Sequence, residues 1–272
     1  MKICFSNLKG CIRGSCRLLV GVFPLISGCG EPPNNPYPAA DNQQNFLYTS
    51  FEERPKHLDP ARAYSANEYE IISQVYEPLL QYAYLKRPYQ LETLTAESMP
   101  TVQYVDKSGA PLPESTPETR IAYSIYDIHV RPDIFFQPHP AFVRKDKGDF
   151  SYHALNPQQL DQIHQLSDLR EAAGRRLTAW DYAYQIKRLA HPKLHSPIAE
   201  MMAEHIVGFK ELGEQLKNEA EKRADSAWLD LRPHSLAGVE VIDDQHFRIR
   251  LHGKYPQFRF WLAMPFFAPM PW

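Results

Sequence analysis

Alternating apolar and polar residues predict short β-strands in three parts of the chain. Residues 45–51 (NFLYTSF) form the first strand candidate, and residues 119–137, rich in β-branched and aromatic residues, indicate a strand, a turn and a second strand. Residues 238–253 carry the clearest hairpin pattern, because apolar residues occupy every second position on both sides of a polar DDQ turn. These residues are Val239 and Val241 before the turn, and Phe247, Ile249 and Leu251 after it.

Apolar residues at helical spacing predict helices between these strands. The helical regions are 67–82, 156–169, 178–190 and 196–225. The last region holds one or two helices, and Gly208 would divide it if there are two. Strands mixed with helices, without a regular strand–helix–strand repeat, indicate a mixed α/β (α+β) fold with more than one layer.

Capping residues predict where three of these helices begin. The N-cap pairs are Asn67 with Glu70, Asn156 with Pro157 at the first helical position, and Thr178 with Asp181. Pro78 is expected to end the first helix, because proline cannot donate the backbone hydrogen bond that a helix interior needs.

The last twelve residues (WLAMPFFAPMPW) are unusually apolar for a chain end. Chain termini usually lie at the surface and are polar or mobile. Two alternatives follow: the segment packs back into a core, or the chain stops in the middle of a domain. The second alternative is the favoured expectation.

The first 29 residues have the pattern of a secretory signal peptide. They carry four basic residues and no acidic one, followed by an apolar run of 11 residues, LLVGVFPLISG. That run is too short to cross a bilayer, which needs roughly 20 apolar residues. The sequence ISGC, ending at Cys29, resembles the lipobox of bacterial lipoproteins, in which the cysteine becomes the lipidated first residue. An ordinary secretory signal, or a chance apolar leader with a cysteine, is the alternative.

Lipidation of Cys29 would anchor the protein to a membrane, since two or more acyl chains hold a protein there stably. Residues 30–45, rich in proline and asparagine, then form a flexible tether. All four cysteines lie at or before Cys29, so the folded part has no thiol. A thiol-free domain suits the periplasm or the cell surface.

The charge balance argues against nucleic acid as a partner. Loss of residues 1–29 removes four of the 30 basic residues and none of the 32 acidic ones, which leaves a net charge of −6. No basic stripe remains to neutralise phosphates.

No catalytic motif is found in the chain, and no cofactor is expected. There is no Gly-x-Ser-x-Gly elbow, no Gly-rich phosphate loop and no His-Glu-x-x-His pattern. His191, His195 and His205 are better explained as solvated residues than as metal ligands, because prolines interrupt a helix through them. His129 and His139 are explained as strand and turn residues, so no metal site is predicted.

Three segments in order resemble one family, the extracellular solute-binding proteins of bacterial peptide ABC importers, the oligopeptide- and dipeptide-binding class called family 5. Residues 56–80 (KHLDPARAYSANEYEIISQVYEPLL) resemble its N-terminal signature. Residues 177–192 (LTAWDYAYQIKRLAHP) resemble a later helix, and residues 238–272 resemble the hairpin and helix late in its first lobe.

The resemblance implies that residues 46–272 form the N-terminal lobe of a periplasmic-binding-protein type II fold, with the second lobe absent and the fold incomplete. It implies a binding protein rather than an enzyme, with peptides or similar solutes as ligands and importer permease subunits as partners. The expectation is a truncated member, which would bind peptides weakly or not at all by itself.

The resemblance also implies a ligand-binding segment after Leu58-Asp59-Pro60. In the family, main chain at this position pairs with an extended peptide, as in β-augmentation. The corresponding residues here are Tyr64, Ser65, Ala66 and Asn67. The alternative is structural: Asn67 only caps the helix, and Tyr64 packs locally. Asp59 is attributed to turn formation rather than to ligand contact.

Two other functions stay open at this point. One is a surface lipoprotein that does not transport, or a non-functional fragment of a binding protein. The other is an exported hydrolase, although no pairing of a nucleophile with a base in the sequence favours it.

Overall fold

The computed structural model describes residues 36–50, 52–145, 148–223 and 228–271, and it divides into two units, residues 1–52 and 53–272. The leader, Cys29 and the first part of the predicted tether lie outside the described residues. Within the described ranges, no helix is both long and apolar enough to cross a membrane.

The first unit contains one short 3₁₀ helix, η1 (Ala39–Gln43). The rings of Tyr37 and Tyr48 stack with their centroids 3.5 Å apart. The strand predicted at residues 45–51 is wrong for residues 45–50, which form no strand. Leu47 is 91% exposed, so the apolar pattern there is not matched by a buried face.

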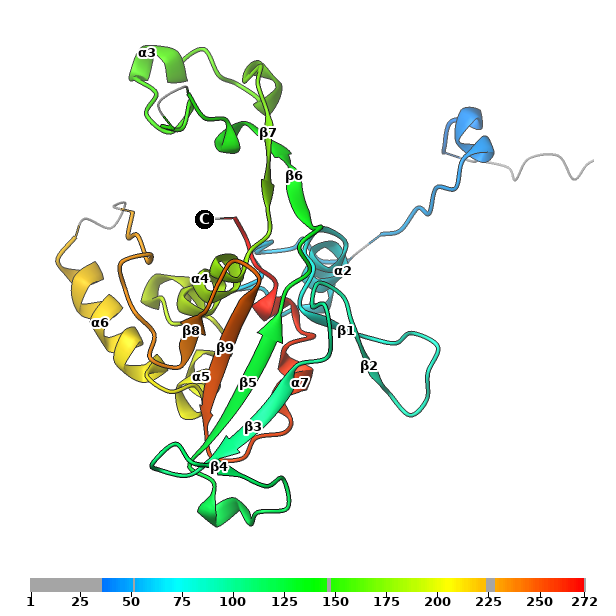
Figure 1. The fold of residues 1–272 in the computed structure, drawn as a ribbon. Coiled ribbons are helices and arrows are strands. Elements are labelled where there is room, and N and C mark those ends of the chain that lie inside the picture. The colour runs from blue at the N-terminus through cyan, green and yellow to red at the C-terminus, as the bar shows by residue number, and fades with distance from the viewer. Residues whose placement is uncertain (1–35, 51, 146–147, 224–227, 272) are drawn as a thin grey trace, which may run out of the picture. The chain divides into compact units, whose positions relative to one another are not determined.

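The second unit is built around a five-stranded antiparallel sheet with the strand order β4-β3-β5-β9-β8 (Figure 1). Its strands are β3 (Thr101–Val105), β4 (Pro111–Leu112), β5 (Tyr123–His129), β8 (Val239–Val241) and β9 (His246–His252). The predicted hairpin at 238–253 is confirmed, with Val239 opposite Ile249 and Val241 opposite Phe247. Side chains of β5 and β9 alternate between a buried face and an outer face, as the period of two requires.

Two further sheets have two antiparallel strands each. The first joins β1 (Leu80–Tyr82) to β2 (Leu91–Thr93), and the second joins β6 (Phe135–His139) to β7 (Ala173–Arg176). The prediction of two strands within residues 119–137 is confirmed, since β5 and β6 lie there. They do not pair with each other: β5 belongs to the large sheet, while β6 pairs with the distant β7.

The helices follow the predicted regions, with differences in length and in their caps. The α-helices are α2 (Ala66–Val75), α3 (Pro157–Leu160), α4 (Ala179–Leu189), α5 (Ala199–His205), α6 (Phe209–Glu221) and α7 (Phe258–Trp261). The other 3₁₀ helices are η2 (Glu118–Arg120), η3 (Pro140–Phe142), η4 (Leu166–Asp168), η5 (Pro192–Leu194) and η6 (Pro265–Phe267). Gly208, with φ of +76°, separates α5 from α6, so the region 196–225 holds two helices.

Two of the three predicted N-caps are confirmed. Thr178 and Asp181 form a capping box at α4, and Asn156 caps α3, although α3 is only four residues long. The cap predicted for the first helix is wrong: Ser65 is the N-cap of α2, and Glu68 completes the capping box. That helix ends at Val75, three residues before Pro78, which was expected to end it.

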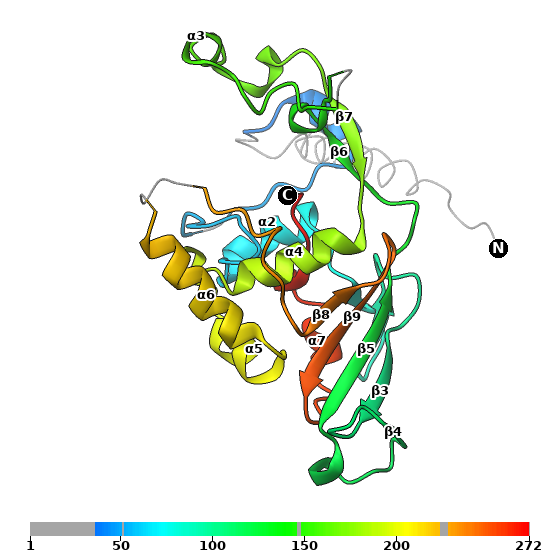
Figure 2. The same cartoon turned by 60° about the vertical axis from the view of Figure 1, so that its left-hand side comes forward.

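The core lies between the large sheet and α4, which crosses the buried face of the sheet and packs on β8, β9 and η6 (Figure 2). Tyr182 of α4 stacks on Phe247 of β9, with ring centroids 5.6 Å apart. Phe266 and Phe267 are buried in the same core, and Ala268 next to them is also buried. These three residues of the apolar end therefore pack inward, and the expectation that the chain stops in the middle of a domain stays a prediction. The mixed α/β class predicted from the sequence is confirmed.

Candidate functional site

A hollow of about 340 Å³ opens between α2, the β1–β2 hairpin and η6, and tyrosines dominate its wall. The lining residues are Tyr69, Ser73, Tyr76, Pro78, Gln81, Tyr82, Ala83, Tyr84, Arg87, Tyr89, Leu94, Ala263 and Pro265. We call this the tyrosine hollow. Tyr69, Ser73 and Tyr76 come from one face of α2, as their spacing of three and four residues requires.

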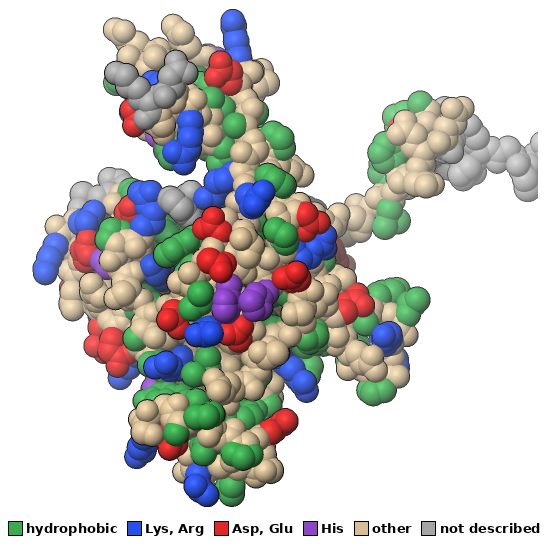
Figure 3. All heavy atoms as spheres, in the orientation of Figure 1, with side chains coloured by type: hydrophobic (Ala, Val, Ile, Leu, Met, Phe, Trp, Pro, Cys, Tyr) green, Lys and Arg blue, Asp and Glu red, His purple; other side chains and the backbone are tan. Residues whose placement is uncertain are grey.

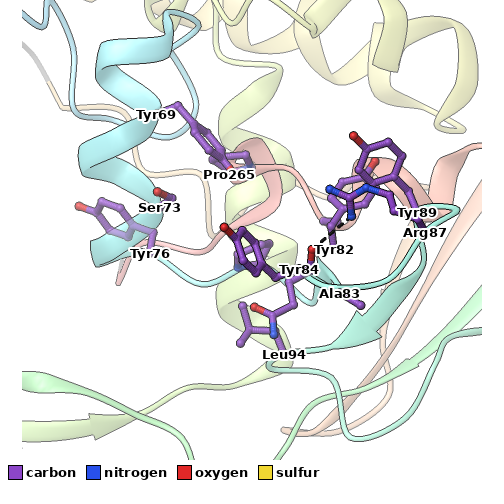
Figure 4. A pocket seen from close by; sticks show the side chains of 13 residues that line it. Tyr69, Ser73, Tyr76, Tyr82, Ala83, Tyr84, Arg87, Tyr89, Leu94 and Pro265 are labelled. Atoms are coloured by element: carbon purple, nitrogen blue, oxygen red, sulfur yellow. Dashed lines mark hydrogen bonds between the residues drawn. The ribbon is translucent and has the colours of Figure 1, made fainter. Parts of the chain in front are cut away.

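The hairpin side of the tyrosine hollow presents aromatic rings and one guanidinium. The ring of Tyr82 meets Tyr89 edge to face, with centroids 6.2 Å apart, and the Arg87 guanidinium lies over the Tyr89 ring at 4.4 Å. Arg87 Nη1 donates hydrogen bonds to the carbonyl oxygens of Tyr84 (3.2 Å) and Lys86 (2.8 Å). These bonds and the ring contact hold the guanidinium at the rim of the hollow (Figure 4).

Two tyrosines of the hollow, Tyr76 and Tyr84, differ in their surroundings. Burial raises the pKa of Tyr76, and the negative charge of Asp59 raises it further. Tyr84 is 87% exposed, so its ring is open to a ligand. Flat aromatic faces, phenol hydroxyl groups and one cation suit an amphipathic ligand that carries a carboxylate.

The tyrosine hollow was not predicted from the sequence. Six of the chain's 15 tyrosines fall within residues 64–89. Six Leu, Ile and Val residues lie in the same segment, so its composition alone does not distinguish a surface from a core.

The predicted ligand segment, residues 64–67, lies at the start of the helix that lines the hollow. Four backbone N–H groups there donate to the buried carboxylate of Glu68. Its Oε1 accepts from Lys56 (3.0 Å) and His57 (2.8 Å), and its Oε2 accepts from Tyr64 (3.0 Å) and Ser65 (3.1 Å). Burial works against the charged form, but the bonds from Ser65, His57 and Tyr64 outweigh it and lower the pKa of Glu68 to about 2.

These bonds limit what residues 64–67 can offer to a ligand. The N–H groups of Tyr64 and Ser65 are already engaged, so they are not donors for a peptide main chain. The Asn67 Nδ2 donates to the Glu53 carbonyl at 2.7 Å, which fixes the approach to the helix. The Tyr64 side chain, 78% exposed, is the group of this segment that most openly faces solvent.

Asp59 forms the turn expected of it and also makes an ion pair that sequence analysis did not predict. Its Oδ1 accepts from the Ala61 N–H at 2.9 Å, which closes the turn. Its two carboxylate oxygens also accept from the two terminal nitrogens of Arg188, at 3.1 and 2.6 Å. Residues 56–80 and 177–192, two of the segments that carry the family resemblance, are therefore joined by a bidentate ion pair.

The histidines weighed as metal ligands lie in different settings. The Nδ1 of His191 accepts from the Lys193 N–H at 3.1 Å, and the ring of His205 stacks on Tyr255 with centroids 3.8 Å apart. Burial lowers the pKa of both histidines. Within the described part of the chain, these residues form no group that could hold a metal ion together.

His129 has a different setting from the one predicted. It meets Asp127 and His246 on the outer face of the large sheet, where β5 and β9 pair. Burial works against the charged form of Asp127, but hydrogen bonds from Arg248 and His246 outweigh it and lower the pKa of Asp127. Sequence analysis could not bring these residues together, because His246 lies more than a hundred residues from the other two.

The comparisons with known proteins find no matching family model and no matching curated protein. Solved structures do match. They include the pheromone receptor PrgZ (19% identity, TM-score 0.44), Listeria monocytogenes OppA bound to peptide (15%, 0.44) and the Escherichia coli murein tripeptide binding protein MppA (18%, 0.43).

Each match covers most of this chain but a small part of the other protein. The shares of this chain are 79%, 79% and 81%, and the shares of the matched chains are 28%, 28% and 30%. This chain therefore spans less than a third of the length of each.

Proposed function

We propose that the chain is a solute-binding protein, which holds peptides outside the cytoplasmic membrane and delivers them to the permease of an ABC importer. The observation that carries the proposal is the tyrosine hollow. It is formed mainly by the helix α2, which lies within the family-like segment at residues 56–80, and by the β1–β2 hairpin that follows this helix. The ion pair between Asp59 and Arg188 supports it, since it joins two segments that carry the same resemblance.

The hollow suits a peptide for three physical reasons. Tyrosine rings give a large contact area with little loss of side-chain entropy, and their hydroxyls can bond either a donor or an acceptor. Such contacts tolerate many side chains, as a peptide importer needs. Arg87 at the rim would bind the terminal carboxylate of the peptide, with two donors matched to its two oxygens.

Tyr64, Ser65, Ala66 and Asn67 stay in the proposal as an extension of this site along the start of α2. Because Glu68 already occupies two of the N–H groups, we assign the contact mainly to the Tyr64 side chain. The proposed role is binding and not catalysis, and it needs no cofactor.

Binding can be measured by saturation-transfer NMR with the detergent-solubilised chain and a mixture of tetrapeptides. We expect weak binding by this chain, with a dissociation constant of roughly 1 mM. The double variant Tyr82→Ala/Tyr84→Ala and the variant Arg87→Met should each reduce the transfer signal strongly, because aromatic and arginine contacts carry most of the binding energy of such sites.

Trp228→Ala is the matched control, since Trp228 is an aromatic residue 74% exposed outside the hollow. It should leave the signal unchanged. Peptides with an amidated C-terminus have no terminal carboxylate for Arg87 to bind, so they should give a weaker transfer signal than the same peptides with a free C-terminus. No signal from any peptide at millimolar concentration, or equal signals from wild type and both hollow variants, would refute the proposed site.

We further propose that Cys29 carries a lipid that anchors the protein to the membrane, on the periplasmic side or at the cell surface. The basic leader, the ISGC sequence and the polar segment 30–45 support this reading. Cys29→Ser should move the protein from the membrane fraction to the soluble fraction after cell lysis. If the variant still sediments with membranes, lipid attachment at Cys29 is not the anchor.

A further inference from the structure

Asp127 and His129 of β5 and His246 of β9 form a cluster on the outer face of the large sheet. The Asp127 Oδ1 lies 2.9 Å from His246 Nε2 and 3.2 Å from His129 Nε2, and the two imidazole rings stack with centroids 4.2 Å apart. One carboxylate oxygen is therefore shared by two imidazole nitrogens. Figure 3 shows histidine side chains meeting at the surface of the molecule over the sheet, with acidic side chains near them.

The strand register places these three side chains together. His129 is directly opposite His246 in the β5–β9 ladder, and Asp127 lies two positions from His129, so all three project from the same face. His129 and His246 are paired across two neighbouring strands, and Asp127 lies on the same strand as His129. The sheet therefore holds the backbone of all three residues in place, and none of them lies on a loop.

We propose that Asp127, His129 and His246 form a binding site for a divalent transition-metal ion of the zinc class. In a tetrahedral zinc site the bonds are about 2.1 Å, so ligand atoms lie about 3.4 Å apart. The two nitrogen–oxygen separations here are close to that spacing. Imidazole and carboxylate are ligands that zinc and its neighbours accept, and three protein ligands leave a position open to solvent.

The local charges also suit a cation. Arg248 donates from Nε to the second oxygen of Asp127 at 2.7 Å, which leaves Oδ1 to face the imidazoles. The Glu240 carboxylate lies 3.9 Å from Arg248 Nη1 and offsets part of the positive charge of the guanidinium. Arg248 thus orients the carboxylate, in the way that partners outside the ligand set orient ligands in metal sites.

The cluster is accessible and can adjust. The His129 side chain is 45% exposed, whereas that of His246 is 16% exposed. The stacked rings must move apart to aim both nitrogens at one ion, and the solvent-exposed side of His129 leaves space for that movement. This site is separate from the tyrosine hollow and shares no lining residue with it, so it does not depend on the proposed peptide binding.

The test is calorimetric titration of the full chain in detergent with Zn²⁺, after all four cysteines are replaced by serine so that thiolates cannot bind the metal. We expect one equivalent to bind. His129→Gln and His246→Gln should each weaken binding by about 100-fold or abolish it, since replacing even a partner outside the ligand set typically costs 10–100-fold. The matched control is His252→Gln, on the same strand as His246 but outside the cluster.

A second readout uses Co²⁺, which absorbs visible light when it is bound by four ligands. This absorption should appear with the parent protein and vanish with His246→Gln. Thermal unfolding of each variant checks that the fold is kept. His129→Gln should disturb the fold less than His246→Gln, because the His129 side chain is more exposed. Absence of Zn²⁺ binding by the parent, or unchanged binding in either the His129 or the His246 variant, would overturn the three-ligand site.

Discussion

At the scale of single residues, Glu68 organises the turn that leads into α2. A buried carboxylate costs free energy unless hydrogen bonds replace its water, and Glu68 receives four of them from backbone N–H groups. The same bonds occupy donors that sequence analysis had assigned to a peptide ligand. One side chain thus both builds the segment 64–67 and limits how it can bind.

Glu68→Gln should lower the free energy of unfolding by about 2 kcal/mol, because hydrogen bonds to a charged acceptor are replaced by weaker ones. In the folded protein the pKa of Glu68 is about 2, below its ordinary value of 4.5. Its contribution is therefore complete above about pH 4.5 and is lost as the pH falls toward 2. Urea unfolding between pH 2 and pH 6 measures both effects.

Glu70→Gln is the matched control, since Glu70 lies on the same helix and its side chain is exposed. It should leave both the stability and its pH dependence close to wild type. If Glu68→Gln unfolds with the same pH dependence as wild type, the four N–H bonds do not hold the carboxylate in its charged form.

At the scale of elements, the junction between α5 and α6 depends on close approach of two backbones. The Val207 N–H donates to the Arg250 carbonyl at 3.1 Å, and the Arg250 N–H donates to the Gly238 carbonyl at 2.8 Å. The loop between the helices therefore sits directly against the start of β8. A Cβ atom at Gly238 would lie 2.5 Å from the Val207 carbonyl oxygen, which is too close for any real contact.

Gly238→Ala should therefore destabilise the protein by about 2 kcal/mol, in the range typical of overpacking. The clash is with backbone, so no side-chain rotation relieves it. Gly174→Ala is the control, because a Cβ there meets nothing within 4 Å. Urea midpoints compare the two variants, and equal midpoints would mean that the junction can open without cost.

At the scale of the whole second unit, the ion pair between Asp59 and Arg188 ties the approach to α2 to the end of α4. Both side chains are largely buried, at 23% and 16% exposed. The Gln185 Oε1 accepts from the same guanidinium at 2.9 Å, and Gln185 in turn donates to the Phe266 carbonyl at 2.9 Å. This network links the start, the middle and the end of the described second unit.

A double-mutant cycle of Asp59→Asn and Arg188→Met should give a coupling energy of about 2 kcal/mol, since the pair is bidentate and shielded from water. Asparagine keeps the oxygen that closes the turn, so the cycle isolates the ion pair. The control cycle uses Arg131 and Asp133, which are 46% and 62% exposed, and should give about 0.5 kcal/mol or less. Equal coupling in both cycles would contradict the structural role of the Asp59–Arg188 pair.

The predictions from sequence were most accurate where short-range chemistry decides the outcome. The Thr178–Asp181 cap, the break at Gly208 and the hairpin at 238–253 were all correct, because each depends on residues close in sequence. The cap of α2 was wrong by two residues. Serine and asparagine are both favoured at the N-cap position, so Ser65 and Asn67 were both candidates. Ser65 is the N-cap because Glu68, three residues later, accepts hydrogen bonds from the backbone N–H groups of Tyr64 and Ser65.

The strand expected at residues 45–51 shows the limit of pattern alone. An alternating run becomes a strand only when a neighbouring strand pairs with it, and among the residues that the structure describes none pairs with residues 45–50. The order of the large sheet shows the same limit, since β5 pairs with the distant β9 rather than with the adjacent β6.

The sequence by itself determined the mixed α/β class, most helix positions and the resemblance to peptide-binding proteins, because these depend on local spacing and on ordered motifs. Only the tertiary structure decided which polar groups meet. The Asp59–Arg188 ion pair, the cluster of Asp127, His129 and His246, and the tyrosine hollow all join segments that are apart in the chain. Such contacts depend on how the whole core packs, and no local pattern of residues encodes the distance across it.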